Sequence, residues 1–123
     1  MPQTKTNYQR GHDAEKRTAE WLTTQGFSIV ELNWRRPQCE IDIIAQKSKG
    51  RFKKVEVMYF IEVKFRSNDN QGDGFDYITP KKLKQMDFAV QMWLAENDWH
   101  HDSRMAVVAV QGSPGGFQMV ELD

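Results

Sequence analysis

The sequence predicts an α/β fold with a central mixed sheet flanked by helices. An amphipathic helical pattern comes first, three β-prone runs follow it, and a second helical pattern precedes two further β-prone runs. That order is typical of an αβββαβ sandwich with one added strand. The 123 residues suffice for one domain with a core. We therefore expect a single domain over 1–123, with a flexible tail at 1–9 and a turn and edge strand at 113–123.

The first helix is predicted over residues 12–25 and ends at Gly26, a residue type favoured just past a helix terminus. Glu15 borders the face of this helix that we expect to be buried. The residues that give that face its helical spacing are Ala14, Thr18, Trp21 and Leu22.

Three strands with two connections should follow this helix. Residues 27–32 and 40–45 are β-prone and are separated by a predicted loop over 33–38. Residues 46–54 form a polar turn around a glycine and contain five basic residues, and 55–65 is the richest run in β-branched and aromatic residues. The last two strands should form an antiparallel hairpin.

The second helix should begin at Thr79 and Pro80, a capping hydroxyl followed by proline, and continue to about residue 96. Residues 67–77, rich in Asn, Asp and Gly, predict an exposed, mobile loop before it. A buried strand over 105–110 and an edge strand over 117–122 should complete the sheet. The apolar stripe of the helix comprises Leu83, Met86, Val90, Trp93 and Leu94.

Composition excludes several classes of protein. Hydrophobic residues at 39% and charged residues at 28% are ordinary for a globular domain. The longest apolar run, 105–110, is far too short to cross a bilayer, and the polar N-terminal residues lack a secretory signal. The single cysteine, Cys39, has no internal disulfide partner. We expect a cytoplasmic protein without membrane contact.

The net charge of zero conceals an uneven distribution. All but one of the 17 Lys and Arg residues lie in 1–84, whereas 85–123 holds Arg104 and six of the 17 acidic residues. A protein that binds nucleic acid needs one basic face, so this pattern is compatible with such a partner. On the charge distribution alone, ordinary solvation of surface charge is the favoured explanation.

Two short motifs have the residue types of a metal-dependent hydrolase. Glu40 and Asp42 are two apart in one predicted strand, and Glu62 and Lys64 are two apart in the next. Residues two apart share one face of a strand, with Ile41 and Val63 expected on the other, so the paired strands should gather the charges in one patch. Clustered carboxylates favour a hard divalent cation such as Mg²⁺, which can activate water and polarise a phosphate.

The same alternation also occurs in any half-exposed strand, where such charges are solvated. Here, however, Phe60 and Ile61 precede Glu62, and Ile43 and Ile44 follow Asp42. Charges that interrupt strongly apolar strands are costly unless they are paired or bind a ligand. This context favours a functional role for the acids.

Taken in order, the motifs resemble those of the YraN-like family of small bacterial proteins, over most of residues 10–110. That family is assigned to the restriction-endonuclease-like PD-(D/E)xK fold and is similar to archaeal Holliday junction resolvases. The shared motifs are Gly11-x-x-x-Glu15 with Ala19 and Leu22, Asn33-Trp34-Arg35, Glu40-Ile-Asp42-Ile-Ile-Ala45, Phe60-Ile-Glu62-Val-Lys64-x-Arg66, Thr79-Pro80-x-Lys82 and Arg104-Met-Ala-Val-Val108.

The resemblance implies that Asp42, Glu62 and Lys64 are catalytic and that Glu15 completes the metal site. We count Asp42, Glu62, Glu15 and Glu40 as candidate ligands of Mg²⁺ or Mn²⁺. Trp34 could stack on an unpaired base or pack in its loop. The candidate nucleic-acid-binding residues are Arg35, Arg36, Lys47, Lys49, Arg51, Lys53, Lys54, Arg66 and Lys82.

We therefore expect a metal-dependent endonuclease acting on DNA, with branched or otherwise non-B-form DNA favoured. One alternative is a nucleic-acid-binding module of the same fold that no longer cleaves. Another is a protein-interaction module that docks through the acidic last third of the chain. Whether the protein forms a homodimer is left open.

Overall fold

A computed structural model describes residues 7–66, 78–112 and 116–122. The predicted mobile loop at 67–77 therefore lies outside the described residues, as do most of the predicted tail and 113–115 of the predicted turn. The elements in chain order are α1 (Asn7–Thr24), β1 (Ser28–Arg36), β2 (Cys39–Lys49), β3 (Val55–Arg66), α2 (Pro80–Asn97), β4 (Asp102–Gln111) and β5 (Gly116–Leu122).

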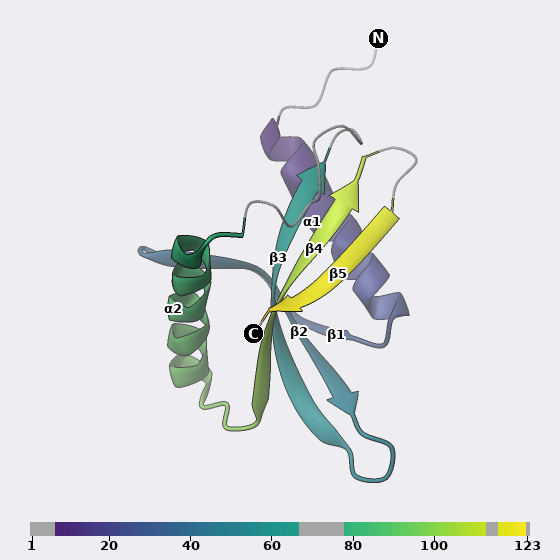
Figure 1. Cartoon of the computed structure of the whole chain (residues 1–123), viewed down its shortest axis with the longest axis vertical. Helices are drawn as coiled ribbons and strands as arrows, with labels where there is room; N and C mark the ends of the chain where they lie inside the picture. Colours follow the sequence, from purple (N-terminus) through teal and green to yellow (C-terminus); the bar gives the residue numbers. More distant parts are fainter. Residues whose placement is uncertain (1–6, 67–77, 113–115, 123) are drawn as a thin grey trace.

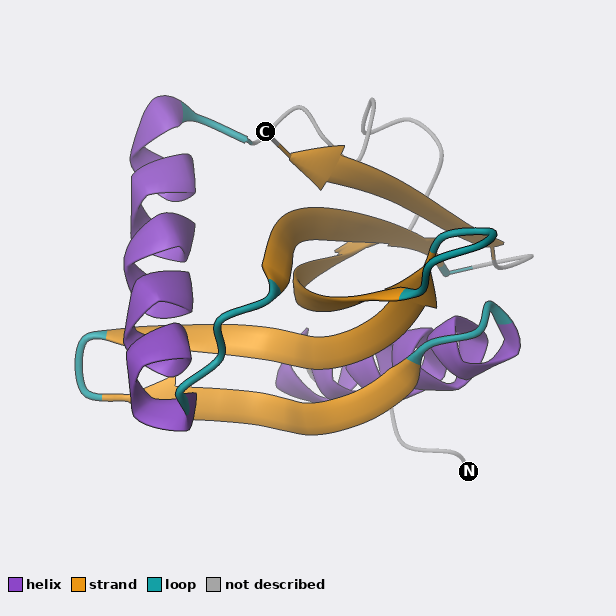
Figure 2. Cartoon of the chain, turned by 90° about the horizontal axis from the view of Figure 1, so that it is seen from below, coloured by secondary structure: helices purple, strands orange, loops and turns teal. Residues whose placement is uncertain are grey.

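The five strands form one mixed sheet in the order β1-β2-β3-β4-β5. Neighbouring strands are antiparallel except β3 and β4, which are parallel and are joined by the crossover that contains α2. The two helices lie on opposite sides of the sheet (Figures 1 and 2). This is the restriction-endonuclease-like αβββαβ sandwich, extended by one strand. The predicted fold, the β2–β3 hairpin and the final edge strand are confirmed.

Helix α1 covers one face of the sheet. Ala14, Thr18 and Leu22 are buried at helical spacing, as predicted, and Trp21 stacks on Phe117 of β5. The helix begins at Asn7, so residues 7–9 belong to it and not to a tail. At its end, Gly26 has a φ of 94°, and the Phe27 amide donates to the Leu22 carbonyl. This is the glycine-terminated helix end that the sequence predicted.

Helix α2 covers the other face. The Thr79 hydroxyl accepts a hydrogen bond from the Lys82 amide, and Pro80 occupies the first turn, so the predicted start is confirmed. Ala89, Val90 and Trp93 are buried against Phe60 and its neighbours on β1, β2 and β3. Within the described residues, no helix combines the length and the apolar character that a bilayer-spanning segment needs.

The predicted loop at 33–38 is mostly wrong, because β1 continues to Arg36 and only Pro37 and Gln38 turn. Trp34 pairs with Ile41 and is 3% exposed in the core under α2, so it packs in the sheet and is not available for base stacking. Strand β2 likewise runs to Lys49, four residues beyond the predicted end. The cationic groups of Lys47 and Lys49 lie over the rings of Phe27 and Tyr59, which lets charged residues continue the strand.

Candidate active site

The candidate site lies where β2 separates from β3. Their pairing ends at Ile43 and Ile61, immediately before Asp42 and Glu62. In place of the next backbone contact, Oδ2 of Asp42 accepts a hydrogen bond from the Val63 amide at 2.8 Å. The Asp42 carboxyl group is therefore fixed at the fork between two central strands.

The predicted strict alternation fails in β2 at this point. Ile41 packs in the core under α2, whereas Ile43 and Val63 pack in the core under α1. The expectation that Ile41 and Val63 share one face is therefore wrong. Asn33 of the neighbouring strand has a φ of 54°, in the left-handed region, so β1 is irregular beside Asp42. The local irregularity leaves Asp42 accessible from α1 and also from the side of α2.

Glu15 meets Asp42 from helix α1, as the resemblance implied. Its side chain is half-buried and lies within hydrogen-bonding reach of Asn33 and Asp42. Its Oε2 atom is buried and has no hydrogen-bond partner among the described residues. A buried carboxylate oxygen without a partner is costly, so this atom is suited to accept a ligand.

Glu62 lies on the α2 side of β3, where side-chain alternation is regular. Its Oε1 atom forms an ion pair of 2.6 Å with Nζ of Lys82 from the first turn of α2. Its Oε2 atom, like that of Glu15, is buried and has no partner among the described residues. Lys82 thus neutralises the Glu62 carboxylate and would compete with a cation for it.

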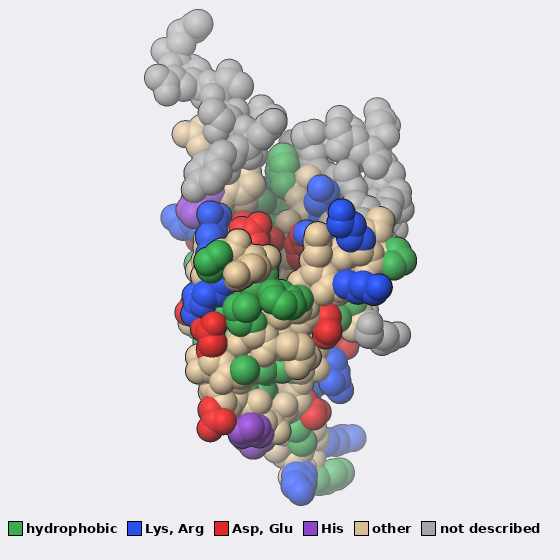
Figure 3. Space-filling model, turned by 90° about the vertical axis from the view of Figure 1, so that its left-hand side faces the viewer, with side chains coloured by type: hydrophobic (Ala, Val, Ile, Leu, Met, Phe, Trp, Pro, Cys, Tyr) green, Lys and Arg blue, Asp and Glu red, His purple; other side chains and the backbone are tan. Residues whose placement is uncertain are grey.

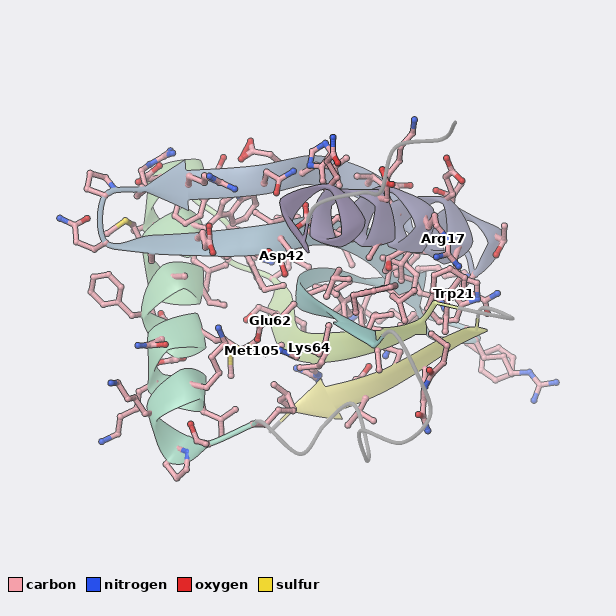
Figure 4. All side chains as sticks on the ribbon, turned by 90° about the horizontal axis from the view of Figure 1, so that it is seen from above. Arg17, Trp21, Asp42, Glu62, Lys64 and Met105 are labelled. Atoms are coloured by element: carbon pink, nitrogen blue, oxygen red, sulfur yellow. The ribbon has the colours of Figure 1, made fainter. Side chains whose placement is uncertain are left out.

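Lys64 is half-buried two residues beyond Glu62 and pairs with Ala109 in the parallel ladder. In Figure 4, Asp42, Glu62 and Lys64 lie near one another at the centre of the view, whereas Arg17 and Trp21 lie apart from them. The three residues of the predicted catalytic set are therefore neighbours on two adjacent strands.

A cavity of about 570 Å³ opens beside the fork, between β2, β3 and α2. Asp42 and Glu62 line its strand side, and Lys81, Lys82 and Lys84 line its helix side. A cavity with carboxylates on one wall and ammonium groups on the opposite wall suits a phosphate that is bridged to the acids by a cation.

Burial and like charge act together on the acids of the site. The pKa of Asp42 is raised to about 7, mainly by burial and in part by the nearby carboxylates of Glu15, Glu62 and Glu40, against the Val63 hydrogen bond, which lowers it. Burial also raises the pKa of Glu15, partly offset by its contacts with Asn33 and Asp42. A bound cation would favour the ionised forms of both groups.

The donor chemistry fits a hard divalent cation, because the site offers carboxylate oxygens from three elements and two of these oxygens are buried without partners. The present arrangement is not a preformed cage. No three acidic, histidine or cysteine side chains of the described residues lie together in a way that holds an ion. Glu62 would have to exchange Lys82 for the ion.

Glu40 and the arginines of β1 make contacts of their own. Glu40 is exposed and pairs with Arg35 at 3.6 Å, outside the buried group of acids. Arg36 pairs with Glu96 of α2 and stacks over the Trp34 ring. These two arginines therefore lie near the fork, but both are neutralised within the protein.

The lysine-rich turn, whose residues the sequence suggests as nucleic-acid contacts, does not flank the site. It joins β2 to β3 at the end of the strands opposite the fork (Figure 1). Lys49 is paired with Glu121, whereas Arg51, Lys53 and Lys54 are exposed around the turn. The predicted basic residues therefore do not form one continuous patch around Asp42. The side chain of Arg66 lies outside the described part of the chain.

Sequence reasoning missed several residues of the cavity wall. Lys81, Lys84 and the half-exposed Phe88 line the cavity from α2, and Asn33 supports Glu15. The start of α2 at Thr79, followed by the sequence Pro-Lys-Lys-Leu-Lys, was a usable signal for the lysines. The role of Asn33 depends on a positive φ that no pattern indicated.

The fold and the acidic fork define a protein of the restriction-endonuclease-like class. Within that class, the chain belongs to the Uncharacterised protein family UPF0102, whose profile matches residues 14–110. It is 35% identical over 112 residues to a UPF0102 protein of Beutenbergia cavernae, covering 90% of this chain and 89% of that protein. It is 37% identical over 115 residues to a UPF0102 protein of Helicobacter pylori, covering 91% and 88%. The predicted family is confirmed.

Proposed function

We propose that the protein is a metal-dependent endonuclease that hydrolyses phosphodiester bonds in DNA. The observation that carries the proposal is that Asp42 lies at the fork of β2 and β3 near both Glu62 and Glu15, each of which has a buried carboxylate oxygen without a partner among the described residues. Mg²⁺ or Mn²⁺ bound there would polarise the phosphate and lower the pKa of a water molecule.

The residues of the chain supply the rest of the chemistry. The Val63 amide fixes the Asp42 carboxylate, and the Lys82 ammonium holds Glu62 at the cavity wall until a ligand enters. Lys64 follows Glu62 on the same face of β3, where its ammonium group can orient a water molecule or stabilise charge on the phosphate. Lys81 and Lys84 present further cations to the DNA backbone from the facing helix.

The test compares wild type with Lys64→Ala and Asp42→Asn on single-stranded, duplex, flap and four-way-junction DNA, with Mg²⁺ or Mn²⁺. We expect wild type to cut at least one substrate. Both substitutions should abolish cleavage, because each removes a group that acts on the reacting phosphate. DNA binding by Lys64→Ala, measured in chelator, should be nearly unchanged, since one lysine is a small part of the total positive charge.

Lys16→Ser is the matched control, because Lys16 is an exposed lysine of α1 and carries the same charge as Lys64. It should cleave like wild type. If wild type cuts none of the substrates while binding one of them tightly, the nuclease proposal fails. The binding module of the same fold, which needs no metal, then takes its place.

A further inference from the structure

The tip of the β2–β3 hairpin, residues 50–54, is the second notable basic feature of the molecule. Its backbone is tightly turned, because Gly50 has a φ of 112° and a Cβ atom there would lie 2.1 Å from the Lys53 carbonyl oxygen. Only glycine permits that approach and that φ without strain. The turn therefore presents Arg51, Phe52, Lys53 and Lys54 in a defined arrangement at the end of the strands.

Two of the positive charges at this tip, Arg51 and Lys53, have no acidic partner within the part of the chain that the structure describes. Arg36, Lys49 and Lys82 each form an ion pair, whereas Arg51 and Lys53 form none. Hydrogen bonds from Ser48 and Gln46 lower the pKa of Glu56 on β3, and the charge of Lys54 contributes to that shift. Two exposed cations without neutralising contacts favour a polyanionic partner.

Phe52 lies between these cations and is 96% exposed, more than any other large hydrophobic residue of the described chain. It contributes nothing to the core in that position. In Figure 3, Lys or Arg side chains and an apolar side chain gather at the lower end of the molecule, where Figure 1 places this hairpin. An exposed aromatic ring among cations has the chemistry that binds single-stranded nucleic acid by stacking on bases.

We propose that the hairpin tip is a contact site for single-stranded nucleic acid, with Phe52 stacking on an unpaired base and Arg51, Lys53 and Lys54 contacting the phosphates. The inference deepens the proposed function, because it names unpaired strands as part of the substrate. It does not require cleavage. Gly50 lies eight residue steps after Asp42, about 26 Å along an extended strand, so one nucleic-acid strand reaching both must span about eight nucleotides.

The test measures binding in chelator, so that cleavage plays no part. The probe is a labelled single strand about 20 nucleotides long, enough to span that distance, together with a blunt duplex of the same length. Phe52→Ala should weaken single-strand binding about fivefold or more, the lower end of what one base–aromatic stack contributes. Phe52→Trp should restore it. Val30→Ala, at a half-exposed position on β1, is the apolar control and should bind like wild type.

The contribution of positive charge at the tip is tested by a second variant, Lys53→Ser, and its matched control, Lys16→Ser. Lys53→Ser should reduce the slope of log affinity against log salt by about 0.7, the value for one phosphate contact on a single strand. Lys16→Ser removes the same charge from α1 and should leave the slope unchanged. Gly50→Ala should weaken binding as Phe52→Ala does, because it disrupts the turn and leaves the ring present.

Two results would overturn the proposal. They are equal single-strand affinities of Phe52→Ala and wild type, and an equal loss of affinity for duplex and single strand. Because no cleavage is measured, the hairpin proposal can hold when the nuclease fails, and the nuclease can hold when the hairpin contact fails.

Discussion

At the scale of single residues, the pKa of Asp42 is raised mainly by burial and further by the nearby carboxylates of Glu15 and Glu62. Asp42 is anchored by one amide, Glu62 by one ammonium group, and Glu15 by contacts with Asn33 and Asp42. Structural ion pairs usually satisfy both oxygens of a buried carboxylate, whereas here Glu15 and Glu62 each retain one without a partner. That arrangement suits a ligand site better than a structural network.

Glu15 provides the first prediction at this scale. Glu15→Gln should weaken Mn²⁺ binding about tenfold, because the amide removes a negative charge beside Asp42. The melting temperature of the metal-free protein should not fall, since the ionised form of Glu15 is disfavoured by burial. Isothermal titration calorimetry measures the affinity. Glu20→Gln, at an exposed position on the same helix, is the control, and an affinity equal to that of this control would reduce Glu15 to a surface residue.

Lys82 provides the second prediction at this scale. Its ammonium group occupies one oxygen of Glu62, so Lys82→Ala should raise the affinity for Mn²⁺ by about fivefold, as removal of a competing charge worth about 1 kcal/mol implies. Cleavage should nevertheless slow, because the lysine also contributes to phosphate binding. Lys81→Ala removes the same charge without touching Glu62, and an equal gain of affinity there would show that the ion pair does not matter.

At the scale of elements, β5 is held in the sheet in two ways. Its backbone pairs with β4, and its Glu121 side chain makes polar contacts with residues of β3 and β2. The Tyr59 hydroxyl donates to Glu121 at 2.7 Å, and Lys49 of β2 reaches the same carboxylate oxygen. The Tyr59 hydrogen bond is the main cause that lowers the pKa of Glu121, with a further contribution from Lys49. The sheet edge is therefore stabilised by an ionised carboxylate.

This lowered pKa predicts how stability depends on pH. An acid with a lowered folded-state pKa stabilises the fold above its unfolded value and loses that contribution as pH falls through the folded value. Tyr59→Phe should therefore reduce the free energy of unfolding by about 1 kcal/mol at pH 7. The difference should shrink below pH 4.5. Urea unfolding across that range measures it, and a deficit that persists at pH 2 would assign the effect to packing.

The elements also show how far sequence reasoning reaches. The helix termini at Gly26 and Thr79, the β2–β3 hairpin and the closeness of Asp42 to Glu62 depend on local residue types, and they were predictable. The continuation of β1 through Trp34 depends on packing against α2, a contact distant in the chain. The loss of alternation at Asp42 depends on the backbone of Asn33 in another strand. Reasoning from sequence patterns assumes regular strands, so it misses both the longer β1 and the irregularity at Asp42.

At the scale of the whole molecule, positive charge lies in two places that differ in how it is compensated. Near the fork, Arg35, Arg36 and Lys82 are each paired with an acid. At the hairpin tip, at the opposite end of β2 and β3, the exposed Arg51 and Lys53 have no acidic partner within the described residues. A nucleic acid bound along the hairpin would contact the uncompensated positive charge at its tip and would reach the acidic fork at its other end.

The most direct test of the central claim is to locate Mn²⁺ in crystals of the protein by anomalous scattering. The account predicts one peak in the cavity beside the fork, about 2.0–2.6 Å from carboxylate oxygens of both Asp42 and Glu62. It also predicts that Glu62 has then left Lys82. The same peak should be absent from crystals of Asp42→Asn soaked in parallel. Saturating Mn²⁺ without a peak between Asp42 and Glu62, or with a peak that survives Asp42→Asn, would contradict the account.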